Sequence, residues 1–252
     1  RVPVGMDTLI LNTEQVAATT PFPAVIEQVR GAFAAFATGN AVMPAKSYID
    51  LPEYEGDFRS MPSYVYTPNW DAAGVKWVNS HPSNPRDHDL PTVMGVFIYS
   101  DPETARPLAI LDGTELTRKR TGAAAAVATD ALAIPDATSL GIVGAGAQSY
   151  DQVEAISTVR QLETIVIVDN NPDRITEFID TFGETYDVRD GTYATAASCD
   201  ILSTVTPVRN PIITRDMVGE HTHINAMGAD ATGKQELDST ILRDAKLVID
   251  NY

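Results

Sequence analysis

The sequence contains one cysteine, Cys199, and only four histidines in 252 residues. A single cysteine excludes an internal disulfide and a thiolate cage for a metal. His221 and His223 are the one close pair of histidines, and their spacing matches no metal motif, so we expect no bound metal. Cys199 stands near Ala197 and Ile201, and this small apolar setting predicts a buried core residue.

Long apolar runs are also absent. No uninterrupted apolar stretch approaches the roughly 20 residues that a transmembrane helix needs. The first residues show no basic segment followed by an apolar run, which is the pattern of a signal peptide. We therefore expect a cytoplasmic protein with no membrane partner.

Basic residues are scarce. There are 18 of them against 34 acidic residues, five of the 18 are lysine, and the formal net charge is -16. Such a surface repels phosphate backbones, so we expect no nucleic-acid partner. The acids are scattered and therefore coat a folded body instead of forming a tail. Abundant carboxylates with few lysines are typical of halophilic proteins, although a moderately acidic mesophilic enzyme is an equally simple interpretation.

Two patterns divide the chain, and the first extends to about residue 112. It opens with a predicted helix, which has Thr20 as its N-cap, Pro21 as its first residue and Gly39 as its stop. The strand-like runs that follow are separated by loops rich in Pro, Asn and Asp, which predicts an antiparallel or mixed sheet. These runs are 45–51, 58–65, 75–78, 93–99 and 108–111.

After a predicted helix over 114–133, the second pattern alternates strands with helices. This alternation predicts a doubly wound parallel sheet, so we expect an α/β protein with one domain over residues 1–118 and a Rossmann domain over 119–252. The predicted strands are 139–143, 164–168, 186–188, 200–205, 222–226 and 246–249, and the predicted helices are 149–159, 172–182 and 239–243.

A glycine-rich turn joins the first of these strands to its helix. In the sequence Gly144-Ala145-Gly146-Ala147-Gln148-Ser149, Gly144 permits the tight turn and Gly146 lets the backbone approach a pyrophosphate. Ser149 is small enough for close packing of helix and strand, and the N–H groups at the helix start face the phosphates. The turn therefore predicts a dinucleotide site, with a nucleotide-free Rossmann-like fold as the alternative.

Asp169 ends the second predicted strand, where an acid would bind the ribose hydroxyls. Its charge should repel a 2′-phosphate, so NAD is favoured over NADP, although Arg174 is close enough in sequence to leave NADP open. A solvated turn acid is the alternative for Asp169. The carboxyl ends of later strands select Thr206 and Met227 as further cofactor contacts.

Four charged residues are candidates for chemistry. Asp230 lies in a Gly-flanked loop and could exchange protons, or it could cap a turn. Lys76 interrupts an apolar strand, so it faces either a site or solvent. Arg59 and Arg120 can each form a bidentate pair with a carboxylate. The remaining cations, Lys46, Arg118 and Lys119, fit solvated faces better.

With these residues in place, the chain resembles the ornithine cyclodeaminase/mu-crystallin family, and within it the archaeal alanine dehydrogenase branch. The likeness runs over nearly the whole chain. It is carried by Phe58-Arg59-Ser60-Met61-Pro62, Lys76-Trp77-Val78-Asn79-Ser80-His81-Pro82, Leu90-Pro91-Thr92-Val93-Met94, Arg120-Thr121-Gly122-Ala123, Gly144–Ser149 and Asn225-Ala226-Met227-Gly228-Ala229-Asp230.

The resemblance implies a homodimer built from an α/β dimerisation and substrate domain joined to the Rossmann domain. It implies Lys76 and Asp230 as an acid–base pair, Arg120 as a ligand of the substrate carboxylate, and Lys46, more loosely matched, as a second one. The cofactor set that we expect is Thr121, Gly144, Gly146, Ala147, Gln148, Asp169, Thr206 and Met227.

Two departures from the family pattern matter. Arg59 stands where an ornithine-specific cyclodeaminase has a glutamate for the distal ammonium, and an arginine there opposes an ammonium. We therefore expect a small, uncharged amino acid, alanine first, and its 2-oxo acid. Family members also continue beyond the sixth strand and fold back onto the first domain, whereas this sequence stops at Tyr252. Without that segment we expect an exposed apolar face on the first domain.

The predicted reaction is reversible oxidative deamination. Cyclodeamination and reduction of a cyclic ketimine are the alternatives on the same scaffold, and a non-catalytic ligand-binding protein of the mu-crystallin kind is an alternative of another class.

Overall fold

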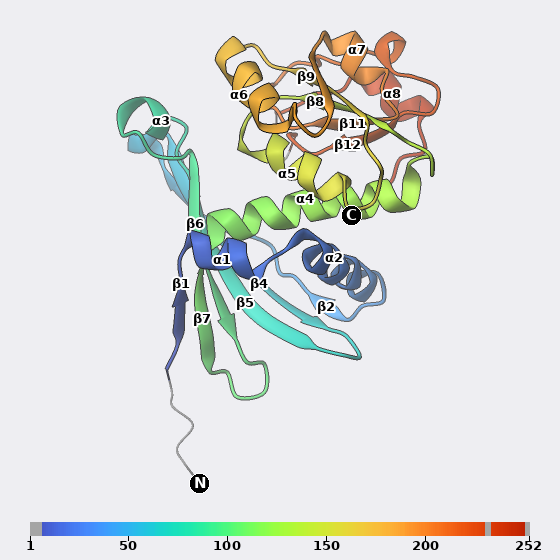
Figure 1. The fold of residues 1–252 in the computed structure, drawn as a ribbon. Helices are drawn as coiled ribbons and strands as arrows, with labels where there is room; N and C mark the ends of the chain where they lie inside the picture. Colours follow the sequence, from blue (N-terminus) through green and yellow to red (C-terminus); the bar gives the residue numbers. More distant parts are fainter. Residues whose placement is uncertain (1–6, 230–232, 250–252) are drawn as a thin grey trace. The chain divides into compact units, whose positions relative to one another are not determined.

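The computed structural model describes residues 7–229 and 233–249 and divides the chain into two compact units, Arg1–Lys119 (unit 1) and Arg120–Tyr252 (unit 2) (Figure 1). The predicted domain boundary after residue 118 lies one residue before this division. Helix α4, Gly113–Leu132, carries the chain from unit 1 into unit 2. Among the described residues, no helix is long and apolar enough to cross a membrane.

Unit 1 is built on a seven-stranded mixed sheet in the order β1-β7-β6-β5-β4-β2, with β3 also paired to β4. Among the described strands of this sheet, β1 and β7 pair in parallel and the other pairs are antiparallel, as the short loops between strands predicted. The strands are β1 Leu9–Leu11, β2 Ala41–Val42, β3 Ser47–Leu51, β4 Gly56–Tyr66, β5 Asp71–Ser80, β6 Val93–Ser100 and β7 Pro107–Asp112.

The helices of unit 1 are α1 Thr13–Thr19, α2 Phe22–Ala37 and α3 Asn84–Asp87, with a short 3-10 turn, η1, over Pro52–Tyr54. Helix α2 packs against β2 and β4. The predicted N-cap of α2 was wrong. Thr20 is the C-cap of α1, and Pro21 is the N-cap of α2, because α1 ends directly before it. The sequence patterns also missed β1 and α1, which are short.

Unit 2 is a five-stranded parallel sheet in the order β10-β9-β8-β11-β12. This confirms the predicted Rossmann topology, in which the strand order reverses between β8 and β11. The strands are β8 Ser139–Val143, β9 Thr164–Val168, β10 Asp187–Asp190, β11 Ile201–Thr204 and β12 His223–Ala226, and the helices are α5 Ala147–Ile156, α6 Pro172–Phe182, α7 Tyr193–Ala197 and α8 Ser239–Asp244, with a 3-10 turn η2 at Arg215–Met217.

The predicted sixth strand does not form in the described part of the chain. Residues 246–249 carry no strand pairing, and Leu247 and Val248 are exposed. Their apolar pattern resembles that of a strand, but a strand exists only where a neighbour accepts its backbone hydrogen bonds.

Both faces of the unit 2 sheet are covered, which is what makes it doubly wound. Along β9, Ile165 and Ile167 face a core that contains α5 and α6, whereas Val166 and Val168 face a core that contains α7 and α8. The packing of α7 on β8 depends on Gly141, because a Cβ there would lie 2.0 Å from the carbonyl oxygen of Ala196. The alternation confirms the parallel sheet, buried on both sides, that the sequence predicted.

Candidate functional site

The glycine-rich turn leaves β8 at the point where the strand order reverses. Gly144 has a φ of +102°, which favours glycine, and its N–H donates to the carbonyl oxygen of Val168 at 2.8 Å. A Cβ at Gly144 would lie 3.0 Å from Cγ2 of Thr206, so the turn after β8 lies against the residue that follows β11. This is the crevice at the carboxyl ends of the strands where open α/β sheets bind ligands.

Helix α5 presents an open N-terminus in this crevice. Gly146 is its N-cap and makes no side-chain cap, and a Cβ on Gly146 would meet nothing within 4 Å. Ala147 is exposed, while Ser149 is fully buried and donates its hydroxyl to the Gly146 carbonyl at 2.6 Å. The backbone N–H groups and the helix dipole therefore suit a phosphate, as predicted from the sequence.

Asp169 follows β9 and is hydrogen-bonded on both of its oxygens. Oδ2 accepts the N–H of Ala145 at 2.7 Å, and Oδ1 accepts the N–H of Asn171 at 2.8 Å. The first bond ties the carboxylate to the glycine-rich turn itself. Asp169 is thus held beside the predicted pyrophosphate site, while its second bond, to the residue two positions on, is that of a turn acid.

The two other strand ends meet at a buried carboxylate that sequence reasoning missed. Thr206, after β11, and Gly228, after β12, both donate hydrogen bonds to Glu236, whose exposed fraction is 1%. The backbone N–H of Met227 donates to the carbonyl oxygen of Thr204 at 3.0 Å. No local signal marks Glu236 as functional, because its partners come from distant segments. The predicted acid Asp230 lies outside the residues that the structure describes.

Arg59 and Lys76 lie on the same face of the unit 1 sheet. In the ladder between β4 and β5, Arg59 pairs with Val78 and Met61 pairs with Lys76, and paired residues share a face. The ammonium of Lys76 lies 3.5 Å from the hydroxyl of Thr117 on α4. Both predicted side chains are half-buried, so Lys76 is not a simple solvent-facing residue of its strand.

Asp57 holds Arg59 in a bidentate ion pair. Nε lies 2.7 Å from Oδ1 and Nη2 lies 2.8 Å from Oδ2, with exposed fractions of 26% and 19% for the two side chains. The guanidinium also lies 5.5 Å from the ring centroid of Tyr48 on β3. Asp57 is not among the residues predicted from the sequence, although a spacing of two on a strand places it on the same face as Arg59.

The other predicted cations are distributed along unit 1 and α4. Lys46 is exposed in the loop before β3, and Arg120 is exposed on α4, next to half-buried Thr121. For Arg118 and Lys119, the expectation of a solvated face was incomplete. Arg118 forms an ion pair with the buried Glu115 at 3.3 Å, and the ammonium of Lys119 lies 4.1 Å from the ring centroid of a phenylalanine on α2.

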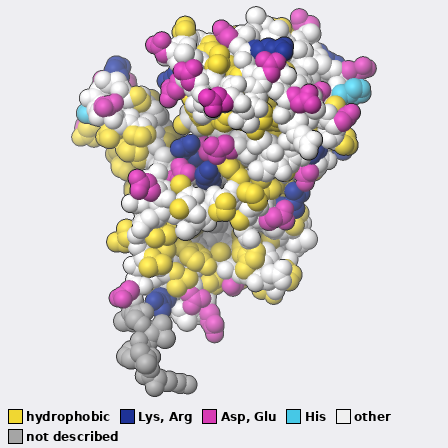
Figure 2. All heavy atoms as spheres, in the orientation of Figure 1, with side chains coloured by type: hydrophobic (Ala, Val, Ile, Leu, Met, Phe, Trp, Pro, Cys, Tyr) yellow, Lys and Arg dark blue, Asp and Glu magenta, His cyan; other side chains and the backbone are white. Residues whose placement is uncertain are grey.

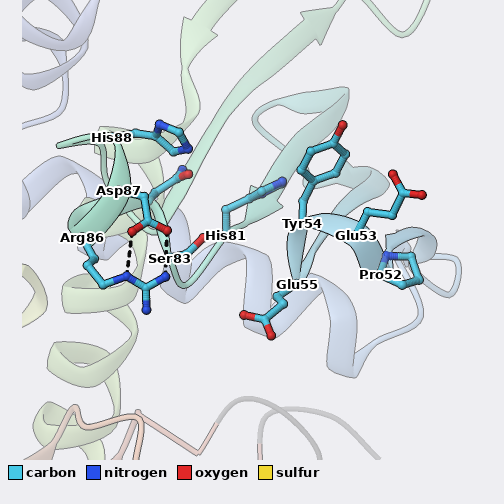
Figure 3. Close-up of a pocket in the computed structure, with 10 residues that line it drawn as sticks. Pro52, Glu53, Tyr54, Glu55, His81, Ser83, Arg86, Asp87 and His88 are labelled. Atoms are coloured by element: carbon cyan, nitrogen blue, oxygen red, sulfur yellow. Dashed lines mark hydrogen bonds and ion pairs between the residues drawn. The ribbon is translucent and has the colours of Figure 1, made fainter.

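A separate cavity of about 420 Å³ lies in unit 1 between η1 and the segment that contains α3 (Figure 3). Its lining is mostly polar and includes the bidentate ion pair of Arg86 with Asp87, which is exposed to solvent. None of the predicted catalytic, substrate-binding or cofactor-binding residues lines this cavity, although His81, from one of the family-like stretches, does.

Cys199 is buried, as predicted, and burial raises the pKa of its thiol to about 11, with a smaller contribution from the charge of Asp200. Among the described residues, no three His, Cys, Asp or Glu side chains are grouped to hold a metal ion. Figure 2 shows the acidic side chains scattered singly or in small groups over the visible face.

Comparisons with known proteins place the chain in one family. The sequence profile of the ornithine cyclodeaminase/mu-crystallin family matches residues 6–252. An alanine dehydrogenase of Archaeoglobus fulgidus is 40% identical over 248 residues, which cover 98% of this chain and 74% of that protein.

Solved structures of similar proteins also match the fold of this chain. An archaeal alanine dehydrogenase dimer with bound NAD superposes with a TM-score of 0.89 at 40% identity, over 95% of this chain and 73% of that one. A Thermococcus litoralis Delta(1)-pyrroline-2-carboxylate reductase in complex with NADH and L-proline has a TM-score of 0.88 at 32% identity, over 95% of this chain and 74% of that one. The resemblance seen in the sequence is confirmed, and the chain belongs to the ornithine cyclodeaminase/mu-crystallin family.

Proposed function

We propose that this protein is an NAD-dependent oxidoreductase that catalyses the reversible oxidative deamination of a small L-amino acid, with alanine as the first candidate. The observation that carries the cofactor assignment is Asp169, whose carboxylate is hydrogen-bonded to the glycine-rich turn at Ala145 beside the open N-terminus of α5. That arrangement suits a pyrophosphate and a ribose with free hydroxyls. The solved relatives with bound NAD and NADH support it.

The residues that would contact the dinucleotide all belong to the predicted set. Gly144, Gly146, Ala147 and Gln148 would surround the pyrophosphate, and Asp169 would accept hydrogen bonds from the ribose. Thr206 and Met227, at the later strand ends, and Thr121 complete the set. These residues would hold the dinucleotide, which would supply the acceptor for the hydride that leaves the substrate Cα.

The protein's own side chains would bind the substrate and move its protons. Arg59 and Arg120 would fix the substrate carboxylate, with Lys46 as a further cation, so that the Cα hydrogen is held in one direction. Loss of the hydride and of an amino proton gives a 2-imino acid. Lys76 and Asp230 would then transfer protons while water adds and ammonia leaves.

The identity of the side chain that the site accepts rests on Arg59. A fixed guanidinium disfavours a second ammonium on the substrate and therefore disfavours ornithine. Asp57 reduces this discrimination, because its carboxylate neutralises much of the charge of Arg59. Because Arg59 still disfavours a substrate ammonium, we propose a substrate with an uncharged side chain. The alanine dehydrogenase relative, at 40% identity, makes alanine the first substrate to test.

Reduction of a cyclic ketimine is the second candidate, and the similar reductase solved with NADH and L-proline favours it. A screen of amino acids and cyclic imines, with NADH absorbance and released ammonia measured together, separates the candidates. A dehydrogenase produces NADH and ammonia in equal amounts, a reductase consumes NADH without ammonia, and a cyclodeaminase releases ammonia without net NADH. Tight NAD binding with no turnover in any assay would indicate a binding protein and overturn the proposal.

The proton-transfer roles are tested by Lys76→Met and Asp230→Asn. We expect each to lower kcat by roughly 100-fold or more, because each removes a proton-transfer group, with NADH binding little changed. Asp216→Asn, a change at an exposed acid of the same unit, is the matched control and should leave kcat unaltered. Near-normal turnover of Asp230→Asn would rule out its assigned role.

We also propose that the protein forms a homodimer, as the solved alanine dehydrogenase does. In unit 1, the sheet face opposite Arg59 and Lys76 carries a shallow apolar groove lined by Phe58, Trp77 and other residues. Trp77 is 39% exposed, so a partner that covered this face would bury apolar surface. Light scattering in solution measures the mass directly, and a monomer at micromolar concentration would contradict the proposal.

A further inference from the structure

Glu236 is a buried carboxylate that accepts four hydrogen bonds. Its Oε1 accepts the backbone N–H of Thr206 at 2.7 Å and the hydroxyl of the same residue at 2.6 Å. Its Oε2 accepts the hydroxyl of Thr204 at 2.9 Å and the backbone N–H of Gly228 at 3.0 Å. Burial of a charged group costs free energy unless it is well hydrogen-bonded, and here every donor is directed at one carboxylate.

The donors belong to two loops that leave the sheet at neighbouring strands. Thr206 lies two residues beyond β11 and Gly228 two residues beyond β12, and both loops contribute to the proposed cofactor site. The loops are in tight contact, because a Cβ at Gly228 would lie 2.2 Å from the carbonyl oxygen of Thr206 and 2.7 Å from Oε1 of Glu236. Glu236 therefore joins the two loops through direct bonds to both backbones.

The donor pattern requires a carboxylate and not an amide. Each oxygen receives one backbone N–H, and a backbone N–H cannot become an acceptor. In a glutamine at this position, one of the two oxygens would be replaced by an NH2 group. Whichever way that amide turned, a donor would face the N–H of Thr206 or of Gly228. The loop after β11 would then lose its backbone bond to Glu236, or the N–H of Gly228 would keep only its second acceptor, the carbonyl oxygen of Thr204 at 3.0 Å.

We infer that Glu236 is a positioning residue for the reaction. Its carboxylate fixes Thr206 and Gly228 at the two strand ends that contribute to the proposed cofactor site. This inference rests on the proposed function, because it concerns the placement of groups around the nicotinamide and substrate. Neither the glycine-rich turn nor Asp169 is hydrogen-bonded to Glu236, and the turn meets the anchored segment only where Gly144 lies against Thr206, so the adenosine diphosphate end of the site depends on Glu236 only indirectly.

The test is Glu236→Gln, which keeps the shape and removes the charge. We expect kcat to fall roughly 10- to 100-fold, since a displacement of reacting groups by about 1 Å has an effect of this order. The dissociation constant of ADP-ribose, which lacks the nicotinamide, should change by less than about threefold, because one mispaired hydrogen bond is confined to the other end of the site. Glu220→Gln, the same change at an exposed residue, should leave both quantities unaltered.

Amide hydrogen exchange provides a readout that does not depend on turnover. In Glu236→Gln, the N–H of Thr206 or of Gly228 should exchange faster, while the strand amides of β9 should not change. If the unaltered protein turned over no amino acid or imine, the proposed function would fail, yet the exchange result would still decide whether Glu236 anchors the loops. Unchanged exchange at both amides, or parallel loss of ADP-ribose binding and kcat, would overturn the inference.

Thr204→Val serves where Glu236→Gln does not fold. Valine has the shape of threonine, and this change removes one of the two donors to Oε2, so the carboxylate is held less firmly against the N–H of Gly228 although no backbone donor is removed. We expect a kcat loss of a few fold without a change in ADP-ribose binding, and faster exchange at Gly228. A Thr204→Val protein that matched the parent in kcat and in exchange would refute the inference.

Discussion

Replacing Asp169 by asparagine tests the cofactor assignment at its central residue. The carboxylate is held on both oxygens, at 2.7 Å from the backbone nitrogen of Ala145 and at 2.8 Å from that of Asn171. Because both bonds would break if the side chain rotated away, the negative charge stays beside the glycine-rich turn. A 2′-phosphate on the adenine ribose would have to bind next to that charge.

The size of the effect follows from the charge and its half-buried position. Two unit charges about 5 Å apart at an effective dielectric constant of about 20 repel by roughly 3 kcal/mol. This corresponds to a preference for NADH over NADPH of roughly 100-fold. In Asp169→Asn the repulsion disappears, so the preference should fall to about tenfold or less. Binding of NADH itself should weaken roughly tenfold, because a hydrogen bond from the ribose to a charged acceptor is lost.

Calorimetric titration of NADH and NADPH into the parent and the variant measures all four dissociation constants. Asp173→Asn, an exposed acid in the first turn of α6, removes the same charge a few residues away and should leave the preference intact. The reasoning would be refuted by a parent protein that binds both cofactors equally, or by an Asp169→Asn protein with the parental preference.

Two further predictions concern stability. In Gly141→Ala the new Cβ would lie 2.0 Å from a backbone carbonyl of α7, so we expect a loss of roughly 1–3 kcal/mol or more in thermal unfolding, whereas Gly146→Ala meets no neighbour and should unfold like the parent. Equal melting temperatures for the two variants would contradict the packing argument. Burial, and to a smaller extent the charge of a nearby arginine, lowers the pKa of His223 below its ordinary value of 6.5. The unfolded chain therefore binds a proton near pH 6.5 that the folded chain does not, and stability falls as the pH drops below that value. Urea unfolding at pH 7 and pH 5 should show a smaller decline for His223→Gln than for the parent or for His221→Gln, an exposed control. The same decline in all three proteins would exclude the assignment.

Short-range patterns in the sequence determined the core of the Rossmann unit. Gly144, Gly146 and Ser149 lie within a few residues of one another, and Asp169 follows the next strand, so spacing alone could place them. The structure agrees at each of these positions because a strand, a tight turn and a helix start are local conformations. The buried Cys199 was predicted for the same reason, from its small apolar neighbours.

Other features depended on partners that the sequence does not name. Residues 246–249 have the composition of a strand, but strand formation needs a neighbour with exposed backbone donors and acceptors, and in the described part of the chain they have none. Arg59 was recognised as a cation, yet its ion pair with Asp57 emerged only from the structure. The roles of Lys76, Arg120 and Asp230 stay predictions.

Glu236 shows most clearly what local sequence patterns cannot predict. Glu236 is one of 34 acidic residues in the sequence. Most of the acidic residues that the structure describes are exposed to solvent. Its burial and its four donors arise because the chain returns three times to the same edge of the sheet, at Thr204 and Thr206, at Gly228 and at Glu236 itself. Local spacing determines a turn or a helix start, whereas the environment of a side chain is decided by segments that only the tertiary fold brings together.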